Sequence, residues 1–407
     1  MKKLISFIGA GRRKEGEKNT YQKATYQFQD GKTFTTAIFP EALVSRNEMD
    51  IGECILIGTN GSSWGCLIEN AAENDDTIFS LYEELETEFD NTATSQKTLQ
   101  KLESVLQKLW NIPVQCYVHD SKITEENVLS ILFGYIDVLK TTNNTNLLID
   151  ITHGFRSMPV LLMGAIQTLD TLFPQGLNLE IIYGEFKPLG TSPVRYLKPV
   201  WDAVRFARAL RFFKERFDGV LLSTFLKKDW KKGAKAVERL SNMIQANFFT
   251  KFDEALNQLK NALDVLPDPC EPTTHLAAQQ LRTLHQRLST PVFFHKRLLA
   301  LADLLAEQQL WGQAITTLQL ALEAFVFHYY KNDQYGDYEV TKNLLKNFSN
   351  LLKEKHDRNL FYRLRNTRNA IAHGGCRSTK GGIPQETNLP SQFKSYRSFC
   401  ELIFKKK

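Results

Sequence analysis

The sequence predicts an α/β domain built on a parallel sheet, followed by an all-α region. In the first half of the 407-residue chain, short apolar runs alternate with segments whose apolar residues recur every three or four positions. Such short runs are typical of buried strands, and the longer repeat is typical of helices that cover a parallel sheet. After Trp201 the short runs disappear and only the helical repeat remains. These two observations predict the order of the two regions.

The elements of the first half can be placed on the sequence one by one. Short buried strands are expected at residues 2–9, 53–59, 114–120, 146–152 and 177–186. Helices are expected at residues 95–111, 125–141 and 157–173. Residues 21–39 alternate between polar and apolar side chains around Asp30 and Gly31, which predicts a β-hairpin after the first strand.

The second half contains helical patterns from Trp201 to the end of the sequence. Residues 266–272, LPDPCEP, contain three prolines, so they break the helical run. We therefore expect three parts: an α/β domain at residues 1–200, a helical connector at 201–300, and a second helical domain at 301–407.

The composition is that of a globular chain, with 43% hydrophobic and 24% charged residues. The apolar run at residues 4–8 is too short for a signal peptide, and no run is long enough to cross a membrane. The six cysteines are scattered and form no CxxC pair, which favours reduced thiols. These features predict a cytoplasmic protein without a membrane partner.

The net charge of +6 is unevenly distributed. Residues 69–90 hold nine acidic side chains and no lysine or arginine, whereas residues 205–239 hold eleven basic side chains against four acidic ones. One interpretation is two solvated helical faces of opposite sign. The alternative is that the basic segment attracts a polyanion such as nucleic acid.

Three polar loops follow predicted strands, at residues 9–13, 58–64 and 150–157. Because ligands bind beyond the carboxyl ends of parallel strands, we expect these loops to form one site. Their glycines, hydroxyls and arginines suit phosphate groups, and Trp64 is a candidate to stack on a base. Ser157 is expected to cap the following helix, with Pro159 in its first turn. The loops lack both a complete GxGxxG fingerprint and a Walker lysine motif, which argues against a nicotinamide cofactor and ATP hydrolysis.

Asp150, Thr152, His153 and Gly154 form a DxTHG motif that resembles the motif of the CRISPR-associated Rossmann-fold (CARF) family. The resemblance covers about the first 190 residues and implies a Rossmann-like domain. It further implies a homodimer, or a higher homo-oligomer, that holds a cyclic oligoadenylate between two copies as activator, with the tetra-adenylate expected rather than the hexa-adenylate. The ligand-binding residues expected on this basis are Gly9, Gly11, Arg12, Thr59, Asn60, Ser62, Ser63, Trp64, Thr152, His153, Gly154, Arg156 and Ser157.

A second motif, RLRNTRNAIAHGG, occupies residues 363–375. Asn369 and His373 are four positions apart, so on a helix the amide can orient the imidazole. Arg368 and His373 are five apart, about 140° out of phase on a helix, so they do not share a face. The motif resembles the RxxxxH signature of HEPN ribonucleases. The resemblance implies a helical domain in which Arg368 and His373 of two protomers form one metal-independent site that cleaves single-stranded RNA, with Asn369 assisting.

Together, the two resemblances predict a CARF sensor, a helical connector and a HEPN ribonuclease domain. The expected function is that of an endoribonuclease activated by cyclic oligoadenylate in type III CRISPR antiviral defence. No metal site and no stable DNA partner are expected. The alternative is a sensor that regulates or binds nucleic acid without cutting it, and the first domain is also a candidate to degrade its own ligand.

Overall fold

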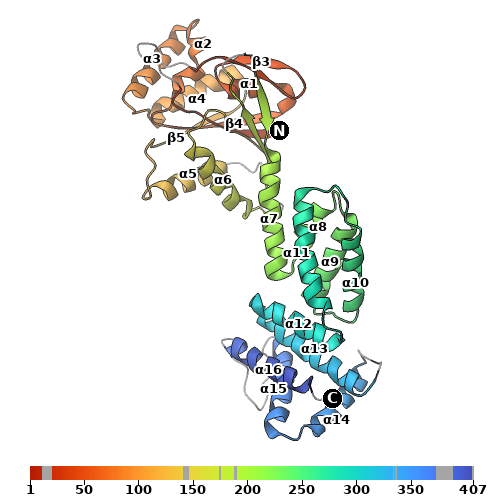
Figure 1. Cartoon of the computed structure of the whole chain (residues 1–407). Coiled ribbons are helices and arrows are strands. Elements are labelled where there is room, and N and C mark those ends of the chain that lie inside the picture. The colour runs from red at the N-terminus through yellow and green to blue at the C-terminus, as the bar shows by residue number, and fades with distance from the viewer. Residues whose placement is uncertain are drawn as a thin grey trace. The chain divides into compact units, whose positions relative to one another are not determined.

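The computed structural model describes residues 1–11, 21–140, 146–173, 176–187, 190–332, 334, 337–372 and 388–405. The chain divides into two compact units, Met1–Asp202 and Ala203–Lys407. The first is an α/β unit, and the elements described after its last strand are all helices (Figure 1). The fold class predicted from the sequence is therefore confirmed.

An eight-stranded sheet forms the centre of the first unit, in the order β3-β2-β8-β7-β6-β1-β4-β5. The strands are β1 (Lys2–Phe7), β2 (Ala24–Gln27), β3 (Thr33–Thr36), β4 (Ile51–Thr59), β5 (Val114–His119), β6 (Asn146–Asp150), β7 (Asn178–Gly184) and β8 (Thr191–Tyr196). The five predicted strands are β1, β4, β5, β6 and β7, and neighbours among them pair in parallel. The predicted hairpin is the antiparallel pair β2–β3.

Strand β8, which pairs antiparallel with β7, was missed by the sequence prediction. Its sequence, TSPVRY, contains a proline and an arginine and so lacks the apolar run expected of a buried strand. The antiparallel register with β7 holds it in place instead.

Helices cover both faces of the sheet. Those of the first unit are α1 (Phe39–Val44), α2 (Glu69–Ala72), α3 (Asp76–Asp90), α4 (Gln96–Trp110), α5 (Val128–Lys140) and α6 (Ser157–Asp170), with two short 3₁₀ helices, η1 (Asn47–Met49) and η2 (Trp64–Leu67). Figure 1 shows α5 and α6 on one side of the sheet and α1 to α4 on the other. In β1, Leu4 contributes to the core on the side of α3 and α4. The predicted helices are α4, α5 and α6.

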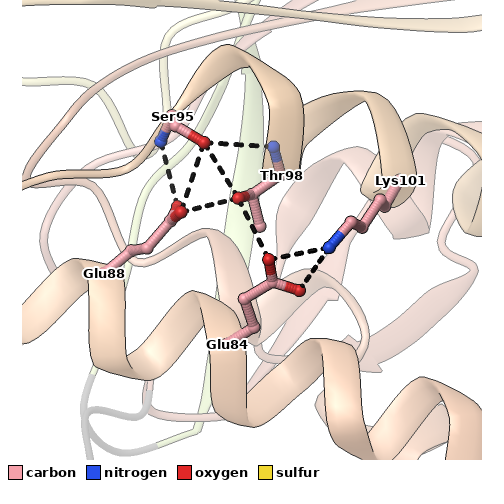
Figure 2. A network of polar contacts seen from close by, with 5 residues as sticks. All are labelled: Glu84, Glu88, Ser95, Thr98 and Lys101. Carbon is pink, nitrogen blue, oxygen red and sulfur yellow. Dashed lines mark hydrogen bonds and ion pairs between the residues drawn. The ribbon is translucent and has the colours of Figure 1, made fainter.

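The acidic segment at residues 69–90 is partly used to hold α4 against α3 (Figure 2). Ser95, the N-cap of α4, accepts a hydrogen bond from the Thr98 amide, and its own amide donates to Glu88 at 2.9 Å. The Thr98 hydroxyl also donates to Glu88, at 2.6 Å, and Lys101 pairs with Glu84 at 2.7 Å. These acidic side chains therefore serve a helix junction rather than only a solvated face.

The second unit contains helices from α7 onward, although α7 begins four residues before Asp202. They are α7 (Lys198–Arg216), α8 (Val220–Leu226), α9 (Lys231–Gln245), α10 (Phe252–Asp264), α11 (Pro272–Ser289), α12 (Phe294–Glu307), α13 (Trp311–Tyr329), α14 (Tyr338–Leu351), α15 (Lys355–Ala372) and α16 (Leu389–Ile403). The expected break at residues 266–272 separates α10 from α11. One apolar core extends from Phe206 to Phe404, on both sides of residue 300, so the boundary near 300 stays a prediction.

No helix among the described residues combines the length and apolar character needed to cross a bilayer. Cys54, Cys66, Cys116 and Cys400 are buried, Cys270 is half-buried, and each of these five is a free thiol.

Candidate functional site

The three predicted loops follow β6, β1 and β4, which are adjacent in the sheet. Their backbones are in contact, because the Ser63 amide donates to the carbonyl of Gly9 at 2.9 Å. A β-carbon at Gly9 would lie 2.2 Å from the carbonyl oxygen of His153, which leaves room only for glycine. The loops therefore meet at one edge of the sheet, as predicted.

Asp150 and Thr152 tie the end of β6 to its neighbours. The Ser6 hydroxyl donates to the buried Asp150 carboxyl at 2.5 Å, and the Thr152 amide donates to the same carboxyl at 2.8 Å. The Thr152 hydroxyl accepts a hydrogen bond from the amide of Gly184 in β7. Burial raises the pKa of Asp150 to about 6, although the bonds from Ser6 and Thr152 oppose this shift. These side chains fix the loop from within.

His153 is also used by the fold. Its Nε2 accepts a hydrogen bond from the Phe39 amide at 3.0 Å, and its ring lies edge-on to Tyr21. Burial lowers the pKa of His153 to about 4. An accepting Nε2 places the proton on Nδ1, so the imidazole is neutral near pH 7. His153 therefore positions the segment before α1 and offers no positive charge to a phosphate.

Gly154 and Tyr21 complete this packing. A β-carbon at Gly154 would lie 2.8 Å from the β-carbon of Phe7. The Tyr21 hydroxyl accepts a hydrogen bond from the Gly9 amide at 2.9 Å. The DxTHG turn thus packs closely against the carboxyl end of β1, which explains why Gly9 and Gly154 are both glycines.

The loop after β4 corrects part of the predicted ligand set. The Ser62 hydroxyl donates to the carbonyl of Ile8 at 2.7 Å, and the Ser63 hydroxyl donates to that of Ala10 at 2.6 Å. Trp64 is only 1% exposed, and its Nε1 donates to the carbonyl of Thr59. The expectation that Trp64 stacks on a base is therefore wrong for this structure. The two serine side chains hold the loop instead of pointing to solvent.

Thr59 and Asn60 have similar internal roles. Thr59 is buried, and its hydroxyl accepts a hydrogen bond from the Gly61 amide at 3.2 Å. The Asn60 side-chain oxygen accepts one from the amide of Ser121, in the segment after β5, at 3.0 Å. The sequence predicted the position of the loop, but it could not show that these polar side chains form hydrogen bonds within the protein.

Arg156 and Ser157 are exposed at the start of α6. The N-cap position is Arg156, without a side-chain capping bond, and Ser157 is the first helical residue, so the predicted Ser157 cap is wrong. The first turn of a helix presents amide groups that attract anions, and Arg156 adds a guanidinium beside them. Gly11, with φ of +68°, continues the same edge after β1. Arg12 lies outside the described residues.

The second candidate site lies on α15. Leu364 and Thr367 are buried, and the Thr367 hydroxyl bonds to that of Tyr396 on α16 at 2.9 Å. This anchoring leaves Arg368 partly exposed, with 33% of its side chain accessible. Asn369 is half-buried one residue later. His373 lies outside the described residues, so its pairing with Asn369 and Arg368 stays a prediction.

Glu323 on α13 is a residue that the sequence interpretation missed. Its carboxylate lies 3.5 Å from the Arg368 guanidinium, and the same oxygen accepts a hydrogen bond from Gln319 at 2.9 Å. Burial raises the pKa of Glu323, while the Gln319 bond and the charges of Arg368 and Arg365 oppose the shift. The available signal was the i, i+4 pair of polar side chains in an otherwise apolar helix. Within the described ranges, no three histidine, cysteine or acidic residues are grouped as a metal site would require.

Comparisons with known proteins show what the chain is similar to. Residues 3–183 match a family model described as the CARF domain of the CRISPR system endoribonuclease Csx1. CRISPR-associated protein MJ1674 of Methanocaldococcus jannaschii is 25% identical over 291 residues, which cover 66% of this chain and 45% of that relative. The chain thus spans under half the length of this curated relative.

A solved structure, Enterococcus italicus Csm6 bound to cyclic hexa-2'-fluoro-hexa-dAMP, aligns over 99% of this chain and 94% of its own, at 10% identity and a TM-score of 0.30. The family match runs from β1 into β7 and includes all three loops of the first site, whereas β8 lies beyond it. Residues 3–183 therefore match a CARF domain, and the chain is similar in sequence to a CRISPR-associated protein.

Proposed function

We propose that the chain is an endoribonuclease that is activated by cyclic oligoadenylate and cleaves single-stranded RNA without a metal ion, in type III CRISPR antiviral defence. The observation that carries the proposal is the Arg368–Glu323 pair, at 3.5 Å, in a chain whose first unit matches the CARF domain of an endoribonuclease family. An exposed guanidinium held by a buried carboxylate is a suitable group to receive a phosphate.

The activator binds at the loop edge of the first unit. Its phosphates contact the backbone near Gly9, Gly11 and Gly154 together with the side chains of Arg12 and Arg156. A cyclic oligoadenylate repeats its phosphates around the ring, so two copies of one loop set, related by a two-fold axis, match it better than one copy does. We propose a homodimer on this basis. We also propose the tetra-adenylate as the ring, although a two-fold axis suits a ring of six nucleotides equally well.

Cleavage uses the nucleophile that RNA carries. The 2'-hydroxyl gives up its proton to a water molecule as its oxygen attacks the adjacent phosphorus, and it displaces the 5'-oxygen of the next nucleotide, giving a 2',3'-cyclic phosphate and a 5'-hydroxyl. Arg368 stabilises the negative charge that develops on the phosphate. His373 donates a proton to the leaving oxygen, and Asn369 orients its ring. Glu323 acts as a positioning residue because it fixes the guanidinium from the buried side.

The proposed site needs two protomers. Arg368 and His373 differ in direction by about 140° on a straight helix, so one copy does not present both to the same phosphate. A second copy of α15 across a two-fold axis supplies the missing partner.

The proposal is tested by incubating the purified chain with end-labelled single-stranded RNA and EDTA, with and without cyclic tetra- or hexa-adenylate. We expect cleavage only when a ring is added, with products that end in a cyclic phosphate. Absence of cleavage with a ring that is shown to bind would overturn the ribonuclease assignment.

A regulator that binds nucleic acid without cutting it is the second candidate, favoured by the basic residues 205–239. It predicts RNA binding in the same assay without products. Degradation of the ring by the sensor domain has less support, because the hydroxyls of Ser62, Ser63 and Thr152 are all hydrogen-bonded within the fold. Labelled cyclic oligoadenylate added to the same reaction would reveal this degradation as linear products.

A further inference from the structure

A groove of about 550 Å³ lies between α9 and α10 in the second unit, apart from both sites described above. One wall carries the basic side chains of Lys232, Lys235 and Arg239. The other carries Glu254, which pairs with Arg239, and the carboxamides of Asn257, Gln258 and Asn261. The two lysines therefore face a wall of mostly neutral groups that both donate and accept hydrogen bonds.

The helical register places these side chains in rows. Lys232, Lys235 and Arg239 are spaced three and four positions apart, so they follow one face of α9 over about 10 Å. The opposite face of α9 is buried in the core through Ala234 and Val237, among others. The row is therefore fixed in direction, because α9 cannot rotate without exposing its apolar face.

The lysines of this groove carry charge that the fold does not neutralise. Arg239 is paired, with Glu254 at 2.9 Å and Gln258 at 2.9 Å. Among the described residues, neither Lys232 nor Lys235 has a carboxylate within ion-pair distance, although the charge of Lys235 reaches Glu238. Both lysine side chains are exposed.

Neighbouring cations of the basic segment differ in this respect. Lys227 pairs with Glu238 at 2.6 Å, and Arg211 pairs with Glu215 at 2.8 Å. Two of the three α9 lysines that lack an ion pair among the described residues thus line the groove, and the third, Lys231, lies outside it. An unpaired lysine pair beside carboxamides is suited to a ligand that offers phosphates and polar edges together.

We propose that the α9–α10 groove binds the sugar–phosphate backbone of single-stranded RNA, at a site distinct from Arg368. Lys232 and Lys235 contact phosphates, and Asn257 and Asn261 hydrogen-bond to ribose hydroxyls or base edges. The inference rests on the proposed function only in treating this RNA as the substrate to be cut. An acidic peptide is the alternative ligand, because its carboxylates suit the lysines and its backbone amides suit the carboxamides, and the test below distinguishes it from RNA.

The test measures binding apart from cleavage. The full chain carrying Arg368→Ala is titrated with a fluorescein-labelled 20-nucleotide single-stranded RNA, and anisotropy is followed over a range of salt concentrations. The groove variant adds Lys232→Gln and Lys235→Gln. The matched control adds Lys231→Gln and Lys260→Gln, which remove the same charge from exposed positions of the same two helices outside the groove.

We expect the groove variant to bind about 10- to 25-fold more weakly at 0.1 M salt, with a salt dependence reduced by about 1.4 in log–log slope. The control should stay within about two-fold of the parent chain. Asn257→Ala with Asn261→Ala should weaken RNA binding without changing the salt slope, which gives a second variant if the lysine pair impairs folding in a thermal melt.

Equal losses in the groove variant and the control would overturn the inference, because they would indicate non-specific attraction. Binding of an acidic peptide with the same lysine dependence, without RNA binding, would overturn it in favour of a protein partner. If the chain with intact Arg368 cuts no RNA while lysine-dependent binding persists, the proposed function fails and the groove assignment stands. If Lys232→Gln with Lys235→Gln leaves RNA binding unchanged, and the same two changes in a chain with intact Arg368 leave cleavage unchanged, the groove assignment fails and the proposed function stands.

Discussion

Arg368 and Glu323 form an ion pair between α15 and α13, with 3.5 Å between the guanidinium and the carboxylate. Glu323 is 9% exposed, and its paired oxygen also accepts the Gln319 amide. A buried carboxylate is stable only with partners, so Glu323 and Gln319 determine where Arg368 can lie. The exposed side of the guanidinium is left for a phosphate.

The first prediction concerns this pair. Glu323→Ala should lower kcat for RNA cleavage about 10- to 100-fold with little change in KM, because Arg368 loses the group that fixes it. Glu323→Asp should restore part of the rate. In a double-mutant cycle with Arg368→Lys, which keeps a positive charge at this position, Glu323→Ala should cost less rate than it costs the parent chain, since both changes act through one side chain.

Glu339→Gln is the control for this experiment, because Glu339 is an exposed acidic residue on α14 paired only with Lys342. Additive losses in the cycle would mean that Glu323 supports the fold rather than Arg368. Unchanged kcat in Glu323→Ala, with a normal melting temperature, would remove its positioning role.

The second prediction separates ligand contact from loop structure in the sensor. Arg156→Ala should weaken binding of cyclic oligoadenylate by roughly 1.5–3 kcal/mol, about 10- to 150-fold, without changing stability. Calorimetric titration measures the affinity. Ser62→Ala with Ser63→Ala should instead lower the melting temperature, because it removes the bonds to the carbonyls of Ile8 and Ala10. If Arg156→Ala binds every ring as tightly as the parent, Arg156 is not a ligand contact.

The third prediction uses two neighbouring groups whose pKa values are shifted in opposite directions. Burial raises the pKa of Asp150 to about 6, so its contribution to stability is present at low pH and is lost as pH rises through 6. Burial lowers the pKa of His153 to about 4, so its contribution is present above about 6.5 and is lost as pH falls towards 4. Each shift corresponds to about 3 kcal/mol, and the two slopes oppose each other between pH 4 and 6.

Single substitutions should separate the pH dependence of stability due to Asp150 from that due to His153. Relative to the parent chain, Asp150→Asn should gain stability as pH rises from 4 to 6, and His153→Gln should lose it. Hydrogen exchange of peptides from β1 and β6 in the full chain measures the local free energy of opening at each pH. Parallel pH profiles in all three proteins would contradict the assigned shifts.

The sequence was sufficient to predict the elements whose own residues are mostly apolar and therefore buried. The runs that became β1, β4 and β6 have apolar residues at their centres, and the apolar repeats of α4 and α6 are regular. The loops at their ends were also predictable, because parallel strands deliver their carboxyl ends to one edge. Strand β8 was not, since pairing with β7 outweighs its own unfavourable residues.

Individual site residues were harder to predict because a polar side chain at a strand end has two possible roles. Ser62 and Trp64 look like ligand contacts in the sequence, yet both bond to carbonyls of the fold. Glu323 shows the reverse case, since Gln319 lies four positions away on the same helix but the charged partner, Arg368, is brought to it only when α15 packs against α13. Tertiary packing decides which residue a polar side chain bonds to, and a single sequence does not reveal that packing.

The last prediction concerns the proposed two-protomer site. Arg368→Ala and His373→Ala should each abolish ring-stimulated cleavage while leaving ring binding unchanged, because the two sites lie in different units. When the two variant chains are mixed and refolded together, half of the statistically formed dimers contain one copy of each. Such a heterodimer keeps one Arg368 and one His373, contributed by different protomers. A site that combines these two groups across the two-fold axis should regain activity in proportion to the heterodimer fraction, measured with differently tagged chains. A site contained within one chain should stay inactive in the mixture, since each chain lacks one of the two groups. Full activity of the His373→Ala homodimer would remove the ribonuclease interpretation and leave the nucleic-acid-binding regulator as the function to test.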